Sequence, residues 1–336
     1  MNNDKLLRIS PSPHAMGAWS VPKVMYGVVF AMVPAILVSF YMFGLGAVRV
    51  LLVASLSCIV FEYLIQRYLI KGSNTIPDGS ALVAGILLGF NVPTSVPTWM
   101  LIVGALVTIG IAKMSFGGLG KNPFNPALVG RVFMLISFPV EMTTWPKPII
   151  SRQYFSFAGL DDKVMDTVTG PTALGILQEE GAKDLPSIAN LELLSEQMAG
   201  SMGEISAIAL IIGGIYMLAR KIITWHIPVS FLGSAIVLSG ILWLADPAQY
   251  ADPLFHIVTG GLLLGVFFMA TDMVTSPMTA KGQIVFGIGA GVLTILIRVF
   301  GAYPEGVAFA ILIMNAFTPL INKGFKPKRF GEKVKA

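Results

Sequence analysis

The sequence predicts an all-α polytopic membrane protein with about ten transmembrane helices. Of its 336 residues, 55% are hydrophobic and 12% are charged, about half the charged share of a typical soluble domain. A water-soluble fold of this length could not bury so many apolar side chains, because part of its surface must stay wetted. The apolar residues also form long runs, which is the pattern of membrane-spanning helices.

A spanning helix needs about 20 predominantly apolar residues, and ten ranges approach this requirement. They are roughly 22–43, 46–66, 79–91, 98–114, 127–145, 202–219, 228–245, 254–271, 283–300 and 304–322. The third range is short and ends in Asn91-Val92-Pro93. A proline there ends a helix, so we expect a half-helix or a re-entrant segment.

The distribution of basic residues predicts the topology. With a cytoplasmic N-terminus and one crossing per range, 16 of the 23 Lys and Arg residues lie on the cytoplasmic side and six outside, while Arg131 lies within a span. The positive-inside rule favours this arrangement. We therefore expect a multi-pass protein with both termini in the cytoplasm, which lies in the inner (plasma) membrane if the cell is bacterial.

The long polar segment 146–201 is predicted to lie in the periplasm or outside the cell. It divides the chain into two halves of five spans, 1–145 and 202–336, the second ending in a basic cytoplasmic tail. Halves with an odd number of spans have opposite orientations, as in an inverted repeat. Leu82/Leu262, Gly85/Gly265 and Pro97/Pro277 recur at a shift of 180, although apolar sequences also give such matches by chance. A true repeat would make the third and eighth spans equivalent broken helices that meet each other.

The sharpest local motif lies in this outer segment, where Asp166–Ala173 reads D-x-x-T-G-P-T. On local pattern alone it indicates a turn, since Gly-Pro breaks regular structure and Thr172 or Thr169 could cap a short helix running to Gln178. The same pattern looks like the recognition sequence of flavin transferases, which join FMN through its phosphate to a threonine hydroxyl.

Over essentially its full length the chain resembles the D subunits of Rnf electron-transport complexes, and more distantly the B subunits of sodium-translocating NADH:quinone reductases. The flavin motif and four other segments carry this resemblance: Ser10–His14, Asp78–Leu82, Gly120–Ala127 and Thr271–Pro277. It implies a fold similar to that of urea transporters, with two inverted five-helix repeats.

The resemblance implies that Thr172 carries covalent FMN and that Asp166, Thr169 and Gly170 are read by the flavin transferase. Pro171 departs from the Ala common in the motif, but it keeps the position small and turn-like. The implied function is electron relay between reduced ferredoxin and NAD⁺ coupled to Na⁺ or H⁺ transport. The implied partners are the ferredoxin- and NAD-side subunits, the iron–sulfur subunits, a second flavinylated subunit and the transferase.

Other polar residues have two interpretations each. Asn122 and Asn125 either form Asx-Pro turns before the fifth span or cradle a second, non-covalent flavin such as riboflavin, or an ion. Asp272 is either an ion or proton ligand at membrane depth or a harmless residue at the interface. Glu62 and Arg131 lie within spans, so they either form ion pairs or contact a cofactor, while Arg131 could also snorkel.

The composition limits what the chain does alone. Its single cysteine, Cys58, excludes a disulfide, a Cys-based iron–sulfur cluster and a structural zinc site within the chain. No G-x-G-x-x-G motif follows a strand, and the basic residues lie between apolar runs rather than on a nucleic-acid-binding face. The competing function classes are a secondary transporter or channel and a structural anchor, neither of which explains D-x-x-T-G-P-T.

Overall fold

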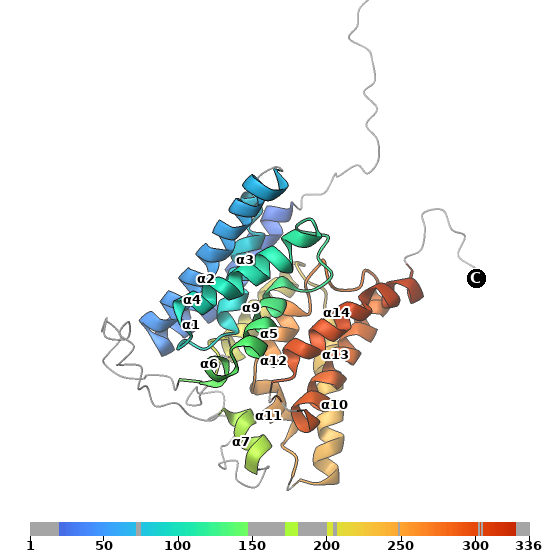
Figure 1. Cartoon of the computed structure of the whole chain (residues 1–336). Coiled ribbons are helices and arrows are strands. Elements are labelled where there is room, and N and C mark those ends of the chain that lie inside the picture. The colour runs from blue at the N-terminus through green and yellow to red at the C-terminus, as the bar shows by residue number, and fades with distance from the viewer. Residues whose placement is uncertain are drawn as a thin grey trace, which may run out of the picture.

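The computed structural model describes residues 20–71, 75–146, 172–180, 200–203, 207–247, 249–301, 303 and 305–326, and most of them are helical. Figure 1 shows the helices packed side by side in one bundle. The N-terminal half contains α1 (Val21–Phe43), α2 (Leu45–Leu64, continued by the π-helix η2, Ile65–Ile70), η3 (Ile76–Asp78), α3 (Ser80–Phe90), α4 (Thr98–Leu106, continued by η4, Val107–Ile111), η5 (Met114–Phe116), α5 (Pro126–Ser137) and α6 (Pro139–Thr143).

The remaining helices belong to the outer segment and the C-terminal half. They are α7 (Ala173–Glu180), α9 (Ala207–Ala219), α10 (His226–Ala245), α11 (Pro253–Val258), α12 (Leu262–Leu264, continued by η7, Gly265–Met269), α13 (Ala280–Phe300) and α14 (Val307–Gly324). The prediction of an all-α polytopic fold is confirmed.

Six helices in the described ranges are long and apolar enough to cross a membrane: Val21–Phe43, Leu45–Ile70, Thr98–Phe116, His226–Ala245, Ala280–Phe300 and Val307–Gly324. Ser80–Phe90, Pro126–Ser137 and Ala207–Ala219 are apolar but shorter. The count of ten crossings therefore stays a prediction.

Two of the predicted ranges are not continuous helices. In the range 127–145, α5 ends at Ser137 and Pro139 opens α6. The range 254–271 breaks between α11 and α12, where Gly260 and Gly261 have φ angles of 62° and 42°. This left-handed conformation suits glycine, so apolar composition alone hid the break.

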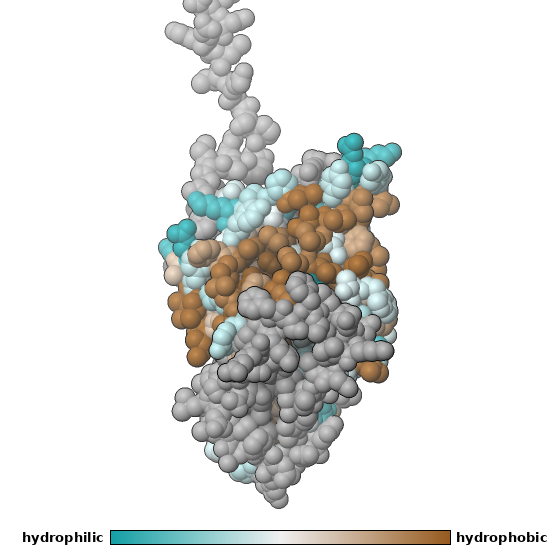
Figure 2. Space-filling view, turned by 90° about the vertical axis from the view of Figure 1, so that its left-hand side faces the viewer, coloured by the Kyte–Doolittle hydropathy of each residue, from teal (hydrophilic) through white to brown (hydrophobic). Residues whose placement is uncertain are grey.

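The surface is apolar where a soluble protein would be polar. Phe30, Leu37 and Leu52 are 62%, 61% and 55% exposed, respectively. Figure 2 shows a hydrophobic band across the middle of one face, with hydrophilic residues gathered at its upper rim. An exposed apolar area of this extent marks contact with lipid.

The third and eighth predicted spans meet at the C-terminal ends of α3 and η7. The Asn91 amide nitrogen, at the end of α3, lies 3.8 Å from the Met269 sulfur, at the end of η7. Asn125 Nδ2 donates to the Met269 carbonyl at 3.2 Å, and Gly203 N donates to the Phe90 carbonyl at 3.0 Å. The backbone groups released by the breaks thus bond within the protein, as lipid requires.

Close packing of α3 on α2 depends on Gly85. A Cβ at this position would lie 2.5 Å from the Ser55 Cα, whereas one at Gly233 in α10 would meet nothing within 4 Å. We expect Gly85→Ala to destabilise the protein by about 1–3 kcal/mol through overpacking and Gly233→Ala to stabilise it by about 0.5–1 kcal/mol through helix propensity. Thermal unfolding in detergent measures both. Equal unfolding temperatures for the two variants would contradict the α2–α3 packing.

Candidate functional site

The first candidate region is the start of α7, where Thr172 lies half-buried. Its hydroxyl oxygen accepts a hydrogen bond from the Gly175 backbone N–H at 3.0 Å. This is the geometry of a helix N-cap, so the predicted capping role of Thr172 is confirmed. Asp166, Thr169 and Gly170, the residues expected to be read by a transferase, lie outside the described residues.

Contacts with the C-terminal half hold α7 in place. Ala173 and Leu174 are buried in a small apolar cluster with Ala251 and Phe255. Gln178 Nε2 donates to the Gly301 carbonyl at 2.7 Å. The Leu174 side chain also packs on the glycine break before α12, at Gly260, where a Cβ would collide with it. Thr172 thus belongs to a helix docked on the bundle, at the end away from the C-terminal turns of α14 (Figure 1).

The second candidate region is a pocket near the N-terminal ends of α1 and α3. It brings together three residues singled out in the sequence, Asn122, Asn125 and Asp272. Its walls are largely apolar and include Val83, Leu87, Phe267 and Phe268, from α3 and η7. About 750 Å³ of empty space lies among the lining residues, part of it open to the outside. Apolar walls with a few polar groups are typical of small-molecule sites.

The polar groups of the pocket differ in how many of their hydrogen-bonding atoms have a partner. Asn125 accepts from the N–H groups of Ala127 and Leu128 at 3.1 and 3.4 Å and caps α5, with Pro126 at its first position. Its role as an Asx-Pro turn is confirmed. Asn122 donates to the Phe124 carbonyl at 3.0 Å, but its Oδ1 is buried and has no hydrogen-bond partner among the described residues. Asn122 can therefore accept a hydrogen bond from a ligand.

Asp272 is half-buried in the segment after η7. Its carboxylate accepts from the Thr275 hydroxyl at 3.0 Å and from the Val274 N–H at 3.4 Å. These local bonds hold it at the edge of the pocket. They orient the side chain without supplying an opposite charge.

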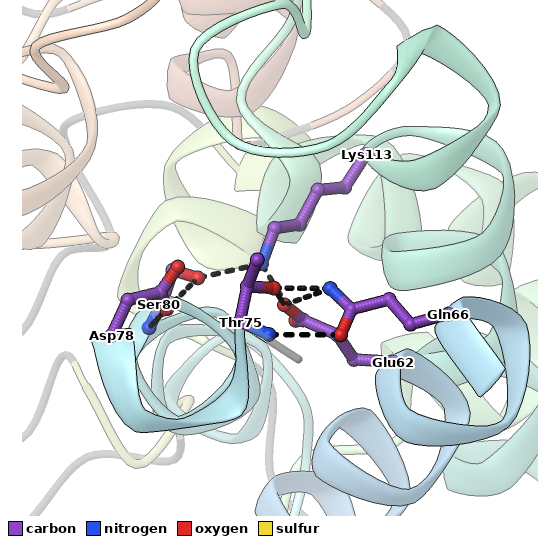
Figure 3. A network of polar contacts seen from close by, with 6 residues as sticks. All are labelled: Glu62, Gln66, Thr75, Asp78, Ser80 and Lys113. Atoms are coloured by element: carbon purple, nitrogen blue, oxygen red, sulfur yellow. Dashed lines mark hydrogen bonds and ion pairs between the residues drawn. The ribbon is translucent and has the colours of Figure 1, made fainter. Parts of the chain in front are cut away.

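An ion pair of Glu62, one of its two predicted interpretations, also reaches this pocket, with a partner that was not predicted. Lys113 lines it and is 2% exposed, and its Nζ lies 2.6 Å from a carboxylate oxygen of Glu62, which is fully buried. Lys113 also donates to the Ser80 hydroxyl at 2.7 Å. Figure 3 shows the lysine reaching Glu62 of α2 and Ser80 of α3 from the turn after η4.

A shell of hydroxyl and amide groups surrounds this pair (Figure 3). Thr75 donates its hydroxyl to Glu62 at 2.7 Å, and Gln66 donates to the same carboxylate oxygen at 3.4 Å. Asp78 accepts from the Ser80 N–H at 2.8 Å. Such bonds compensate for the cost of removing two charges from water.

The second charge predicted within a span also has a partner. Arg131 of α5 forms an ion pair with Glu305, just before α14, and both side chains are largely buried. Snorkelling of Arg131 to the interface is therefore wrong. The two charged residues noticed in spans are each paired, but with residues that sequence reasoning had assigned to the ends of spans. Lys113 was missed because a lysine at the end of a span normally faces water.

Breaking the Glu62–Lys113 pair from one side should be costly. We expect Lys113→Met to destabilise the protein by about 3–5 kcal/mol, since it leaves a buried unpaired carboxylate. Combining it with Glu62→Gln should recover most of that loss. Arg67→Met, at an exposed position on η2, should change stability by less than about 0.5 kcal/mol. Thermal unfolding of the wild type, Lys113→Met, Glu62→Gln, the double variant and Arg67→Met tests this, and additive effects of the two single changes would contradict the pairing.

Comparison with known proteins places the chain in a family. The NQR2, RnfD, RnfE family matches residues 8–331. The chain is 43% identical over 332 residues to the D subunit of the proton-translocating ferredoxin:NAD(+) oxidoreductase complex of Clostridium ljungdahlii, covering 97% of this chain and 96% of that protein. It is 40% identical over 329 residues to the Na(+)-translocating counterpart of Acetobacterium woodii, covering 98% and 96%. The chain belongs to the NQR2, RnfD, RnfE family.

Proposed function

We propose that this protein is the membrane-embedded D subunit of an ion-translocating ferredoxin:NAD⁺ oxidoreductase complex. Near-complete coverage in both directions by relatives with that name carries the proposal. One of these relatives is named for protons and the other for Na⁺, so the names leave the ion open. Because the chain has one cysteine and no dinucleotide motif, ferredoxin oxidation and NAD⁺ reduction belong to partner subunits.

The proposed redox group of this chain is FMN, joined through its phosphate to the Thr172 hydroxyl by a flavin transferase that reads Asp166, Thr169 and Gly170. The position of Thr172 supports this. It precedes the eight-residue helix α7, and the free N–H groups and dipole of a helix N-terminus favour a phosphate there. A flavin attached in this way supplies both one- and two-electron chemistry, because its ring is not used for attachment.

The proposed place of a second, non-covalent flavin such as riboflavin is this pocket. Phe267 and Phe268 offer aromatic walls, and the unused Oδ1 of Asn122 could accept from the ring imide N–H. Asp272 and Lys113 would lie at its edge. Acid precipitation releases non-covalent flavin from the purified subunit, and a supernatant without flavin would remove this part of the proposal.

We also propose that the two halves form an inverted repeat of five spans each. The pattern of helix contacts supports this. In the first half α2 packs on α3 and α4, and in the second α10 packs on η7 and α13. Between the halves α1 contacts α9, and α5 contacts α14, so corresponding elements meet across the bundle as a two-fold relation requires.

Loop contacts support the proposed topology. Segments assigned to the outer side contact each other: Ser95 with Thr144 and Gln178 with Gly301. Segments assigned to the cytoplasmic side do likewise, as in the bonds Thr224–Gln283 and Met278–Asn322. The flavin helix α7 then lies outside an inner membrane and both termini lie inside.

Replacing Thr172 tests the flavin site. We expect the wild-type chain, co-expressed with its flavin transferase, to give a fluorescent band on a denaturing gel under ultraviolet light. Thr172→Ala removes the hydroxyl that would form the ester and should abolish the band. Thr143→Ala is the matched control, because this exposed threonine lies at the outer end of the predicted fifth span and donates to carbonyls of its own helix α6. A dark wild-type band would reduce the chain to the alternative, a transporter or channel of the same fold.

Reporter fusions test the topology separately. A reporter active only in the periplasm should work when fused near Asp184 and should be silent when fused after Lys335, because the basic tail favours the cytoplasm. A cytoplasm-only reporter should give the opposite result at both positions. Activity of the periplasmic reporter at Lys335 would exclude an even number of crossings with a cytoplasmic N-terminus.

A further inference from the structure

A buried asparagine in α14 takes no part in the two regions described above. Asn315 is 2% exposed, and neither its side-chain oxygen nor its side-chain nitrogen has a hydrogen-bond partner among the described residues. An unpartnered amide in an apolar interior is unfavourable. A polar residue at such a position in a spanning helix therefore indicates a ligand or a functional role.

The backbone carbonyl of Asn315 also lacks its usual helical hydrogen bond. Pro319 lies inside α14, and proline has no N–H to donate to the carbonyl four residues earlier, which is that of Asn315. Asn315 therefore offers a second oxygen that lacks its usual helical bond. One residue thus brings a side-chain and a backbone acceptor to the same turn.

Neighbouring contacts show which way this turn faces. Ile311, one turn earlier, reaches a point 3.4 Å from where a Cβ on Gly265 of η7 would lie. Thr318, one turn later, donates its hydroxyl to the Thr275 carbonyl at 2.9 Å. Residues three or four apart share a helix face, so Asn315 faces the stretch between Gly265 and Thr275. That stretch contains η7 and the turn that follows it at the end of the eighth span.

The chemistry of this place favours a cation. The buried face of α14 carries no charged side chain: it comprises Val307, Ala308, Ala310, Ile311, Met314, Asn315 and Thr318. Asp272 belongs to the facing stretch and lines the neighbouring pocket, and its carboxylate has hydrogen bonds but no cationic partner among the ion pairs of the described residues. Neutral oxygens beside a broken helix suit a small cation that sheds part of its water.

We propose that Asn315 is a ligand for a monovalent cation, Na⁺ or hydronium, at the C-terminal end of the eighth span. The inference rests on the proposed ion-translocating function but not on the flavin at Thr172. The same oxygen chemistry serves both cations, so the experiment has an arm for each. Occupation by a water molecule alone is the competing outcome.

The test uses the complete complex, purified and assayed for ferredoxin-dependent NAD⁺ reduction. In the Na⁺ arm, Asn315→Leu should raise the Na⁺ concentration for half-maximal rate at least tenfold. In the hydronium arm, in Na⁺-free buffer, it should move the limb of the pH–rate profile by one unit or more. Asn315→Asp, which keeps the oxygen and adds a negative charge, should bind the cation more tightly than the wild type. Ser239→Ala is the control, because this buried serine in α10 is bonded within its own helix, to the Ala235 carbonyl at 2.7 Å, and should shift neither value.

A binding measurement without turnover separates this idea from the proposed function. The unfolding temperature of the wild-type complex should rise with NaCl relative to choline chloride, or with acidity if hydronium is the ligand. Asn315→Leu should lose that dependence while keeping the fluorescent band on Thr172. The proposal would be overturned if the unfolding temperatures of wild type and Asn315→Leu depended equally, within twofold, on both NaCl and acidity. A stabilised Asn315→Leu complex with unchanged cation dependence would do the same and would identify a water. If Asn315→Leu does not assemble, Asn315→Asp decides: cation dependence identical to wild type in rate and unfolding overturns the proposal.

Discussion

Interrupted helices in lipid must find partners for every backbone group they release, and this requirement organises the bundle. The Phe90 carbonyl at the end of α3 accepts from Gly203, and the Met269 carbonyl at the end of η7 accepts from Asn125. Arg298 of α13 donates to the carbonyls of His256 and Thr259 beside the glycine break. Arg49 of α2 donates to the carbonyls of Thr94 and Val96 after α3. Because the partners come from distant segments, the breaks hold the bundle together instead of weakening it.

Buried charged side chains, like the backbone groups at helix ends, also find partners within the bundle. Glu62 with Lys113, and Arg131 with Glu305, place four ionisable groups inside the bundle as two pairs. The first pair lies beside the pocket and is bonded further to Ser80 and Thr75. The second joins α5 to the start of α14, elements from opposite halves. In many proteins the desolvation penalty of a buried ion pair exceeds the Coulomb energy that the pair gains. Stability alone therefore does not explain these two pairs, and a functional role for the charges is consistent with their burial.

Much of the fold was readable from the sequence because lipid imposes a simple rule on length and polarity. The long helices α1, α2, α10, α13 and α14 begin and end within a few residues of their predicted ranges. The breaks were harder to see. Pro93 predicted the end of α3, but nothing in the sequence distinguished Gly260 and Gly261 from other glycines in apolar runs. Their role depends on backbone angles, which composition does not reveal.

The candidate site was predictable to the extent that it is local. Thr172 caps α7 as a Thr before a short helix should, and Asn125 caps α5. That Asn122, Asn125 and Asp272 line one pocket could not be derived from spacing, since the three come from two segments about 150 residues apart. The burial of Lys113 and Asn315 was not predicted, for another reason. A lysine at the end of a span and an asparagine in a helix are unremarkable until the fold buries them.

The docking of α7 has a consequence for the order of synthesis. Every contact described for this helix is made with a segment that follows it in the chain: Ala251, Phe255, Gly260 and Gly301. A ribosome completes α7 well before it reaches α11 or α13, so α7 has none of these partners when it is first made. The docked position of α7 is therefore reached only after the second half of the chain has been made.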